Sequence, residues 1–461
     1  MNAVTRATAA ASTTGVAVRV PGRFDLLALH AANPARYPHL LESVAHDTPR
    51  ARYDILFAFP GETLILDSER RLHLDGQTQP GDFLETFDRL WSRERVPEGQ
   101  RDLPFTGGWF VFLGYELAMS IEPAVGELPV DPQWPIATAV RIPAAIIYDH
   151  QAEQAWLVCE KSHEHLLAPM QADLASPALP PEESIALSEC NEEEPARFLD
   201  GVRRVLDYIR AGDVFQVNLS RVWNARLERA LPAWKLYQRL RQTNPAPFAG
   251  LVTLSHGQGI ISSSPERLVS VTGQRVSTRP IAGTHPRGKD SVEDRALAGQ
   301  LLKHPKERAE HIMLIDLERN DLGRICRPGS VRVDELMSLE TYRHVHHIVS
   351  EVAGLLRDGV TPGEVIRAVF PGGTITGCPK VRCMQIIREL EAAPRAAYTG
   401  SMGYVNRDGS MDLNILIRTL WQREDRIQWR AGAGIVADSN PERELNETRV
   451  KARGLQAALS S

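Results

Sequence analysis

The stretch PARFLDGVRRVLDYIRAGDVFQVNLSR, residues 195–221, changes from the hydrophobic period of a helix to that of a strand. In its first part the apolar residues recur at helical spacing, and Gly212 is placed to end the helix. From Val214 onward apolar and polar residues alternate, as they do along a strand. The chain therefore combines helices and strands.

The predicted strand has an apolar face that begins with Phe215 and a polar face that carries Gln216, Asn218 and Ser220. A row of polar side chains on one strand face usually contacts solvent. The wall of a polar cleft is the alternative. The alternation alone leaves both interpretations open.

The composition excludes some classes of protein. The chain has 461 residues, of which 43% are hydrophobic, enough for a sizeable core and too many for a disordered protein. Its net charge of −5 argues against a nucleic-acid-binding protein, which needs a broad basic field. An anionic ligand would have to be held by a few local cations, backbone amides or a metal ion.

The remaining signals concern location. The five cysteines have no zinc-ligand spacing, so we expect reduced thiols. No apolar run approaches the roughly 18 residues of a membrane span. The first fifteen residues lack the apolar core of a secretory signal. We expect a cytoplasmic protein with no membrane segment.

The pattern divides the chain into four parts. Residues 1–20 are expected to be a flexible tail, and residues 21–165 alternate apolar runs with turn residues, as in RYDILFAFPGETLILD, which predicts hairpins. Residues 166–194 are rich in Pro, Ala, Ser and Glu and are predicted to be a linker. Residues 195–459 are expected to form a second domain.

Two predicted helices carry paired carboxylates. KERAEHIMLIDLERND places Glu307 and Glu310 one turn apart. SNPERELNETRVKARGLQAAL begins with a capping Asn-Pro pair and places Glu444, Glu447 and Lys451 on one face. Two such pairs could form an all-oxygen magnesium site. A solvated charged helix face is the alternative for either pair alone.

MDLNILIRTLW, residues 411–421, reads as one strand that is apolar on both faces. Arg418 within it is then expected to be largely buried, and a buried guanidinium needs an anion. That anion is either an internal carboxylate or a ligand. The preceding GYVNRDGS has a hairpin turn signal, which places Tyr404 on the neighbouring strand.

Two shorter motifs could contact an anion, and a third carries a lone carboxylate that, taken singly, is most often exposed. RAGAGIVADS presents Gly432, Ala433 and Gly434, which are small enough for a carboxylate to reach backbone amides, although a tight turn is the commoner meaning. ISSSPERL contains the lone carboxylate Glu266. TRPIAGTHPRG, residues 278–288, has prolines and glycines that exclude a helix or regular strand and predict a stiff cationic corner.

Taken in order, these segments resemble the chorismate-utilising enzymes. The resemblance covers about residues 195–459 and rests on GDVFQVNLSR, SSSPERL, RPIAGTHPRG, ERAEHIMLIDLERNDLGR, VHHIVSEVAG, PGGTITGCPKVRCMQIIRELE, AYTGSMGY, MDLNILIRT, AGAGIVADS and NETRVKA. PHLLESVAHDTPRARYDILFA resembles the amino-terminal domain of the family's synthase large subunits. The resemblance implies an α+β fold, an anthranilate-synthase-like layered sandwich of large antiparallel sheets with flanking helices.

The resemblance also implies roles. Chorismate, a dianion, would bind with Mg²⁺ held by Glu310 and Glu447, with Glu307 and Glu444 as outer partners. Glu266 would be the general acid that protonates the departing hydroxyl, which requires a raised pKa. His347 is shared by the family's aminating members. The implied substrate-binding residues are Tyr404 and Arg418 for the enolpyruvyl carboxylate, Gly432, Ala433, Gly434 and Lys451 for the ring carboxylate, and Gly283 and Thr284.

Two positions bear on the nucleophile. Relatives that add water have a lysine base where this chain has Gln216, and a neutral amide cannot deprotonate water. We therefore predict that ammonia is the nucleophile and that the polar strand face is a cleft wall. Ala282 stands where the aminodeoxychorismate synthase pattern PIKGT has a nucleophilic lysine, whereas anthranilate synthase has PIAGT, as here.

The predicted enzyme is an aminodeoxychorismate synthase large subunit, which aminates chorismate to 4-amino-4-deoxychorismate for p-aminobenzoate and folate synthesis. QVNLS, and VHHIVS with His346, favour this product. Ala282 keeps amino-isochorismate and anthranilate open as products. A tryptophan-binding subunit with little catalysis is a further alternative.

Two further partners are implied. LLES places Ser43 where relatives bind tryptophan, although a buried serine at a strand end is an equal alternative. No cysteine lies in a nucleophile-elbow context, so ammonia would come from a separate glutamine amidotransferase subunit or from solution.

Overall fold

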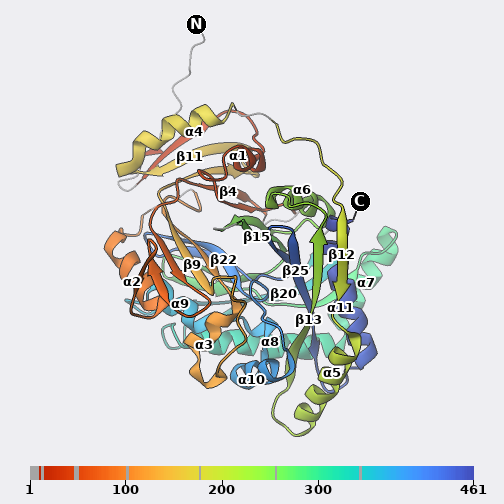
Figure 1. Ribbon diagram of the computed structural model, residues 1–461. Coiled ribbons are helices and arrows are strands. Elements are labelled where there is room, and N and C mark those ends of the chain that lie inside the picture. Colours follow the sequence, from red (N-terminus) through yellow and green to blue (C-terminus); the bar gives the residue numbers. More distant parts are fainter. Residues whose placement is uncertain are drawn as a thin grey trace.

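Two large antiparallel sheets form the centre of the protein (Figure 1). The computed structural model describes residues 10–11, 15–45, 51–99, 103–175, 178–254, 257–341 and 345–460. Every strand pair within these ranges is antiparallel. The predicted α+β class and layered antiparallel sheets are confirmed.

The first sheet has strands from both halves of the chain. In spatial order its strands are β1 (Ala10–Ala11), β2 (Gly15–Val20), β11 (Gln154–Glu160), β10 (Ala144–Asp149), β4 (Tyr53–Ala58), β3 (His39–Glu42), β14 (Phe248–Thr253), β15 (Gln258–Ser264), β24 (Thr419–Arg423), β25 (Arg426–Ile435), β13 (Gln216–Leu227) and β12 (Leu187–Glu192), with β21 (Gly377–Cys378) paired to β13.

The second sheet also crosses the predicted domain boundary. Its strands are β18 (Ile281–Pro286), β20 (Val345–Leu355), β17 (Arg275–Thr278), β16 (Arg267–Thr272), β23 (Met411–Asn414), β22 (Ser401–Asn406), β8 (Gly108–Leu113), β9 (Ala137–Ile142), β5 (Thr63–Leu66), β6 (Leu72–Leu74) and β7 (Gln77–Gln79), with β19 (Arg332–Thr341) paired to β20. The β3–β14 and β22–β8 pairs join the two halves into one body.

Helices cover the outer faces of both sheets. α1 (Leu26–Ala32), α6 (Ala233–Thr243) and α11 (Pro441–Leu459) share an apolar cluster with the first sheet. α2 (Phe83–Glu94), α5 (Pro195–Arg210), α9 (Pro362–Val369) and α10 (Lys380–Leu390) share another, largely with the second sheet. The remaining helices are α3 (Ala118–Ile121), α4 (Leu167–Asp173), α7 (Ser291–Lys303), α8 (Pro305–Gly323) and the 3₁₀ turns η1 (Tyr115–Leu117), η2 (Pro123–Val125), η3 (Lys161–Leu166) and η4 (Gly373–Ile375).

A third apolar cluster fills the space between the two sheets. It contains Phe57 and Val252 of the first sheet and Phe110 and Tyr404 of the second, all buried. Side chains that alternate along each strand therefore have a core on either side, which explains the strongly apolar strands of this chain.

The predicted tail and linker contain regular structure. Residues 15–20 form β2, which pairs with β11, while residues 1–9 and 12–14 lie outside the described part. Within residues 166–194, α4 contributes Met170 to the core and β12 pairs with β13. Composition misled the prediction here because a sheet edge accepts polar sequence. β12 is such an edge, with five of its six residues exposed.

The corner predicted at residues 278–288 is instead a bulged strand. β18 pairs with β20 at the edge of the second sheet, and the register shifts between Ala282 and Thr284. Gly283 has φ +62° at this shift, a left-handed conformation suited to glycine. Prolines are tolerated because the strand is an edge.

The predicted strand over residues 411–421 is also wrong. β23 belongs to the second sheet and β24 to the first, so residues 415–418 cross between the sheets. The crossing is apolar on both sides because it lies between two sheets. Arg418 is half-buried and has φ +51°, a strained conformation for a residue other than glycine.

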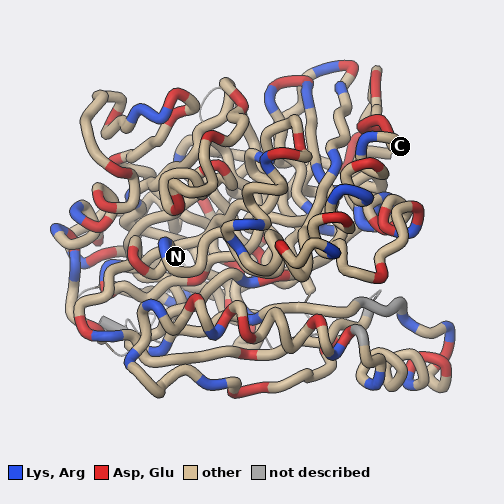
Figure 2. Tube along the Cα trace, turned by 90° about the horizontal axis from the view of Figure 1, so that it is seen from below, with Lys and Arg blue, Asp and Glu red and all other residues tan. Residues whose placement is uncertain are grey.

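The surface agrees with the expected charge pattern. Figure 2 shows acidic and basic residues interspersed along the described trace, without a broad basic face. Within the described residues, no helix has both the length and the hydrophobicity that a membrane span requires.

Candidate functional site

The polar face of β13 is the starting point of the site. Gln216 is buried, and its Nε2 donates to Glu310 Oε1 of α8 at 2.7 Å. The side-chain amide of Asn218 donates to the Thr374 carbonyl oxygen at 3.2 Å, and Ser220 is buried against Glu391. The polar face is therefore internal, and the solvent-exposed interpretation is wrong.

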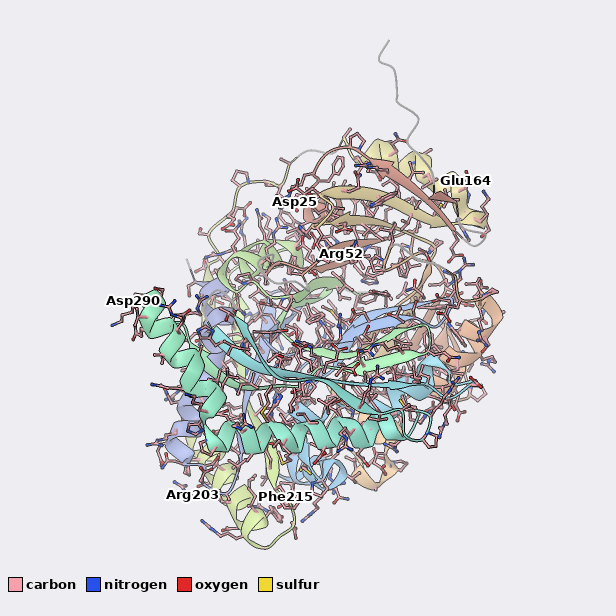
Figure 3. The ribbon with its side chains drawn as sticks, turned by 180° about the vertical axis from the view of Figure 1, so that it is seen from behind. Asp25, Arg52, Glu164, Arg203, Phe215 and Asp290 are labelled. Atoms are coloured by element: carbon pink, nitrogen blue, oxygen red, sulfur yellow. The ribbon has the colours of Figure 1, made fainter. Side chains whose placement is uncertain are left out.

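Phe215 departs from the predicted apolar face. It precedes β13, its backbone N–H donates to the Cys378 carbonyl oxygen, and it is 70% exposed. Figure 3 labels it in the lower part of the view. The alternation holds only from Gln216 onward, because the strand begins there.

The glycine run of β25 lies on the strand next to β13 in the same sheet, directly across from the polar residues of β13. Gly434 pairs with Asn218 and Gly432 with Ser220, so the run is part of a strand and the tight-turn alternative is wrong. A Cβ on Gly434 would lie 2.3 Å from Gln216 Nε2, so only glycine allows this approach without a shift of that amide. Ala433, between them, is buried.

The open edge of β25 can receive an anion. Pairing with β24 ends at Trp429, so beyond it β25 pairs only with β13 among the described strands. The Gly432 carbonyl oxygen accepts from Lys451 Nζ at 3.0 Å and thus points away from β13. In an antiparallel strand the N–H groups of Gly432 and Gly434 point to that same edge. Two amides and an ammonium group therefore converge there.

Glu266 follows β15 and is almost fully buried. Burial raises the pKa of Glu266 to about 7, although Thr374, Arg418 and Lys451 each act to lower it. The Thr374 hydroxyl donates to Glu266 Oε1 at 2.8 Å. At neutral pH a large fraction of this carboxyl group is protonated, as a general acid requires.

His347 of β20 and Ala282 of β18 belong to paired strands, and the backbone of Ile281 in β18 hydrogen-bonds Glu266. His347 is buried, and burial, reinforced by Arg418, lowers its pKa to about 3, so its imidazole is neutral. It pairs with Thr284 across the strands. The side chain of Thr284 lies outside the described part. Ala282 is buried against Leu314 and Leu317 of α8.

The predicted metal ligands form two pairs, Glu307 and Glu310 on α8 and Glu444 and Glu447 on α11. Glu310 meets Gln216, and Glu307 lies beside Gly283, where an added Cβ would be 2.8 Å from Glu307 Oε2. On α11, Glu444 is buried, while Glu447 is exposed and pairs with Lys451 at 2.7 Å.

The two groups approach the same strand. Glu310 lies at Gly434 and the Lys451–Glu447 pair at Gly432, positions separated by roughly 7 Å along a strand. Among the described residues no group of three or more His, Cys, Asp or Glu side chains is assembled to hold a metal ion. Carboxylates are the donors that Mg²⁺ prefers, but further ligands would have to come from substrate and water.

Tyr404 and Ser43 lie elsewhere, in the lining of a separate cavity of about 120 Å³. Ser43 Oγ donates to the Pro247 carbonyl oxygen at 3.2 Å, and Met402 is part of the lining. The tyrosine near the glycine run is Tyr398, whose hydroxyl oxygen would lie 2.7 Å from a Cβ on Gly432. Tyr398 thus replaces Tyr404 in the candidate site.

Sequence reasoning missed Thr374 and Tyr398. Both lie in motifs that the resemblance used, PGGTITG and AYTGSMGY, but neither was singled out. A threonine within a glycine-rich turn and a tyrosine beside a Thr-Gly pair were the available signals. Choosing Tyr398 over Tyr404 required knowing which one faces β25.

Comparison with known proteins gives a consistent result. The family model described as chorismate binding enzyme matches residues 41–457. An anthranilate synthase component I-like protein of Synechocystis is 44% identical over 371 residues, covering 79% of this chain and 75% of the relative. Aminodeoxychorismate synthase component 1 of Bacillus subtilis is 41% identical over 391 residues, covering 82% of each chain.

A solved structure agrees with the fold. The crystal structure of anthranilate synthase component I from Streptococcus pneumoniae is 33% identical, covers 89% of this chain and 93% of its own, and superposes with a TM-score of 0.79. Relatives named for two different products thus match this chain at similar identity.

Proposed function

The chain belongs to the family of chorismate binding enzymes, and we propose that it aminates chorismate to 4-amino-4-deoxychorismate. Glu266 carries the proposal, because its buried carboxyl group with a pKa near 7 can protonate the hydroxyl that leaves the ring. In the overall exchange the C–O bond breaks, a C–N bond forms, and the hydroxyl leaves as water. Anionic groups of the substrate would face the amides of β25, Lys451 and Arg418.

Ammonia is the proposed nucleophile. Gln216 occupies the wall of the site with its amide committed to Glu310, and a neutral amide cannot serve as a base. Neutral ammonia has its own lone pair and needs no deprotonation before it attacks. A glutamine amidotransferase partner is the proposed source of that ammonia.

Magnesium is proposed as the cation that accompanies the substrate. Glu310 and Glu447 would hold it, with Glu307 and Glu444 around them, and the ion would offset repulsion between these carboxylates and a substrate carboxylate. Glu447 forms an ion pair with Lys451 in the structure, so its carboxylate would have to leave Lys451 in order to bind the magnesium ion.

Anthranilate is the second candidate product, and Ala282 is the observation that favours it. Its side chain is apolar and packs against two leucines of α8, so no covalent intermediate can form at this position. Ammonia must then perform every displacement itself, and a single displacement would stop at amino-isochorismate, the precursor of anthranilate.

Product analysis tests the proposal. The protein is incubated with chorismate, Mg²⁺ and an ammonium salt, and the products are separated by chromatography. We expect 4-amino-4-deoxychorismate, and about 10²–10⁴-fold less of it with Glu266→Gln. Direct formation of fluorescent anthranilate would reject the proposed product, and no product at all would favour a subunit with little catalysis.

Tryptophan is the proposed ligand of the cavity that contains Ser43. The cavity is lined by apolar and polar side chains, among them Arg267 and Asp412, which pair with each other at 2.7 Å and would share their charges with a zwitterionic aromatic amino acid. Equilibrium dialysis with tryptophan tests this part separately. Ser43→Ala removes a hydroxyl group and should weaken tryptophan binding, and Met402→Trp fills the cavity and should abolish it.

A further inference from the structure

Arg395 lies between the end of α10 and the start of β22 and is almost fully buried. Its Nε and Nη2 donate to the Glu391 carboxylate at 2.9 and 2.7 Å. Nη2 also donates to the Asn218 carbonyl oxygen at 2.8 Å, and Nη1 donates to the Ile375 carbonyl oxygen and to Thr399 Oγ1, each at 3.3 Å. All five N–H donors of the guanidinium are therefore used.

Two of these acceptors, the carbonyl oxygens of Asn218 and Ile375, lie next to residues of the candidate site. Asn218 is two residues from Gln216 on β13, and its own amide donates to the Thr374 carbonyl oxygen. Ile375 directly follows Thr374, whose hydroxyl donates to Glu266. A shift of either segment would move the wall of the site or the partner of the acid.

A further acceptor, Thr399 Oγ1, lies next to residues 415–418, which cross between the two sheets. The backbone N–H of Thr399 donates to the Leu416 carbonyl oxygen at 2.7 Å, two residues before Arg418. Leu416 N–H donates in turn to the Gly400 carbonyl oxygen at 2.8 Å. Both Thr399 and Arg418 have positive φ, so this connection is held in a conformation that the local chain does not favour.

We propose that Arg395 is a positioning residue for the amination reaction, whose one guanidinium fixes three separate segments of the site relative to each other. These segments carry Gln216, Thr374 and Arg418. The inference rests on the proposed function only in taking these segments as the chorismate site. Arg395 touches no reacting atom and acts through its neighbours.

The surroundings of Arg395 suit this role. Glu391 also accepts from the Ser220 N–H and from Arg430 Nη2, at 2.7 and 2.8 Å, so the acid that holds Arg395 is itself fixed to β13 and β25. A lysine would keep the charge but has three donors on a flexible stem and cannot reach all these acceptors. A lysine substitution therefore keeps the positive charge and removes the fixed arrangement of hydrogen-bond donors.

The first test compares Arg395→Lys with Arg141→Lys. Arg141 is a matched control, because it is a largely buried arginine of β9 that donates to Glu160 and to two carbonyl oxygens, those of Gly108 and Ile142. We expect Arg395→Lys to lower kcat by about 100-fold, the size of effect that a displacement of about 1 Å produces, with a smaller change in KM. Arg141→Lys should lower thermal stability and leave kcat unchanged.

The pH profile gives a readout that loss of stability would not move. The Thr374 bond lowers the pKa of Glu266, so loosening it should shift the alkaline limb of the kcat profile to higher pH in Arg395→Lys. Thr374→Val should cause the same shift. The double variant should shift no further than either single variant, since one contact would be lost by both routes.

Hydrogen exchange monitored by mass spectrometry tests the inference without any activity. In Arg395→Lys we expect faster exchange in all three segments, residues 215–220, 372–378 and 414–420, and no such change in Arg141→Lys. Faster exchange confined to residues 391–399, or equal loss of kcat in both lysine variants, would overturn the proposal. Wild-type protein that makes no product would instead count against the proposed function, while the exchange result would still decide the role of Arg395.

Discussion

Glu266 and Glu391 are both buried carboxyl groups, yet their environments hold them in different protonation states. Burial is the largest influence on each. Glu266 accepts one side-chain hydrogen bond, from Thr374, and its pKa rises to about 7. Glu391 is in direct contact with Arg395 and Arg430, which bring its pKa below the ordinary value despite burial.

The comparison shows that two arginines in direct contact lower the pKa of a buried acid despite its depth. Arg418 and Lys451 act on Glu266 only as weaker influences, so this group keeps a proton to donate. Glu391 stays ionised and can hold two arginines in place. One carboxyl group is suited to chemistry and the other to architecture.

The largest effect is expected from Glu391→Gln. Removing this charge leaves Arg395 and Arg430 buried without their shared anion, which should cost about 3–5 kcal/mol of unfolding free energy. Urea denaturation measures the change. Glu389→Gln, on the exposed end of α10, is the control and should change the free energy by less than about 0.5 kcal/mol. A small loss at Glu391 would break the contrast between the two acids.

A smaller effect is expected from Thr374→Val, which removes the hydroxyl bonded to Glu266 with little change of volume. A hydrogen bond to a charged group contributes about 1.5–3 kcal/mol, so the pKa of Glu266 should rise by roughly one to two units. Activity that depends on protonated Glu266 should therefore persist to higher pH. The pH dependence of kcat measures this, and an unchanged alkaline limb would show that the hydroxyl does not tune the acid.

A further effect concerns how the stability of the protein depends on pH. Glu266 has a folded-state pKa above its unfolded value, so its contribution to stability is present at low pH and is lost as pH rises from about 4.5 towards 7. Glu266→Gln should flatten this loss, and its melting temperature should exceed that of the wild type at pH 7.5 more than at pH 5. Calorimetry at both values would detect the difference, and equal shifts would indicate an acid without a raised pKa.

The sequence identified the parts of the site better than their surroundings. Glu266, Gln216, Glu310 and the glycine run were all found, and the structure brings Gln216 and Glu310 together with Gly434. Tyr404 was chosen where Tyr398 faces β25, because two tyrosines six residues apart give the same local signal. The ligand set of the magnesium site stays a prediction.

Periodicity determined that this chain alternates helices with strands, and the order of its motifs determined the family, because side-chain spacing and motif residues are local properties. Only the tertiary structure decided that residues 411–421 leave one sheet for the other, that Tyr398 and not Tyr404 faces β25, and that Arg395 joins three distant segments. Each depends on which surfaces meet after folding, and spacing along the chain carries no information about that.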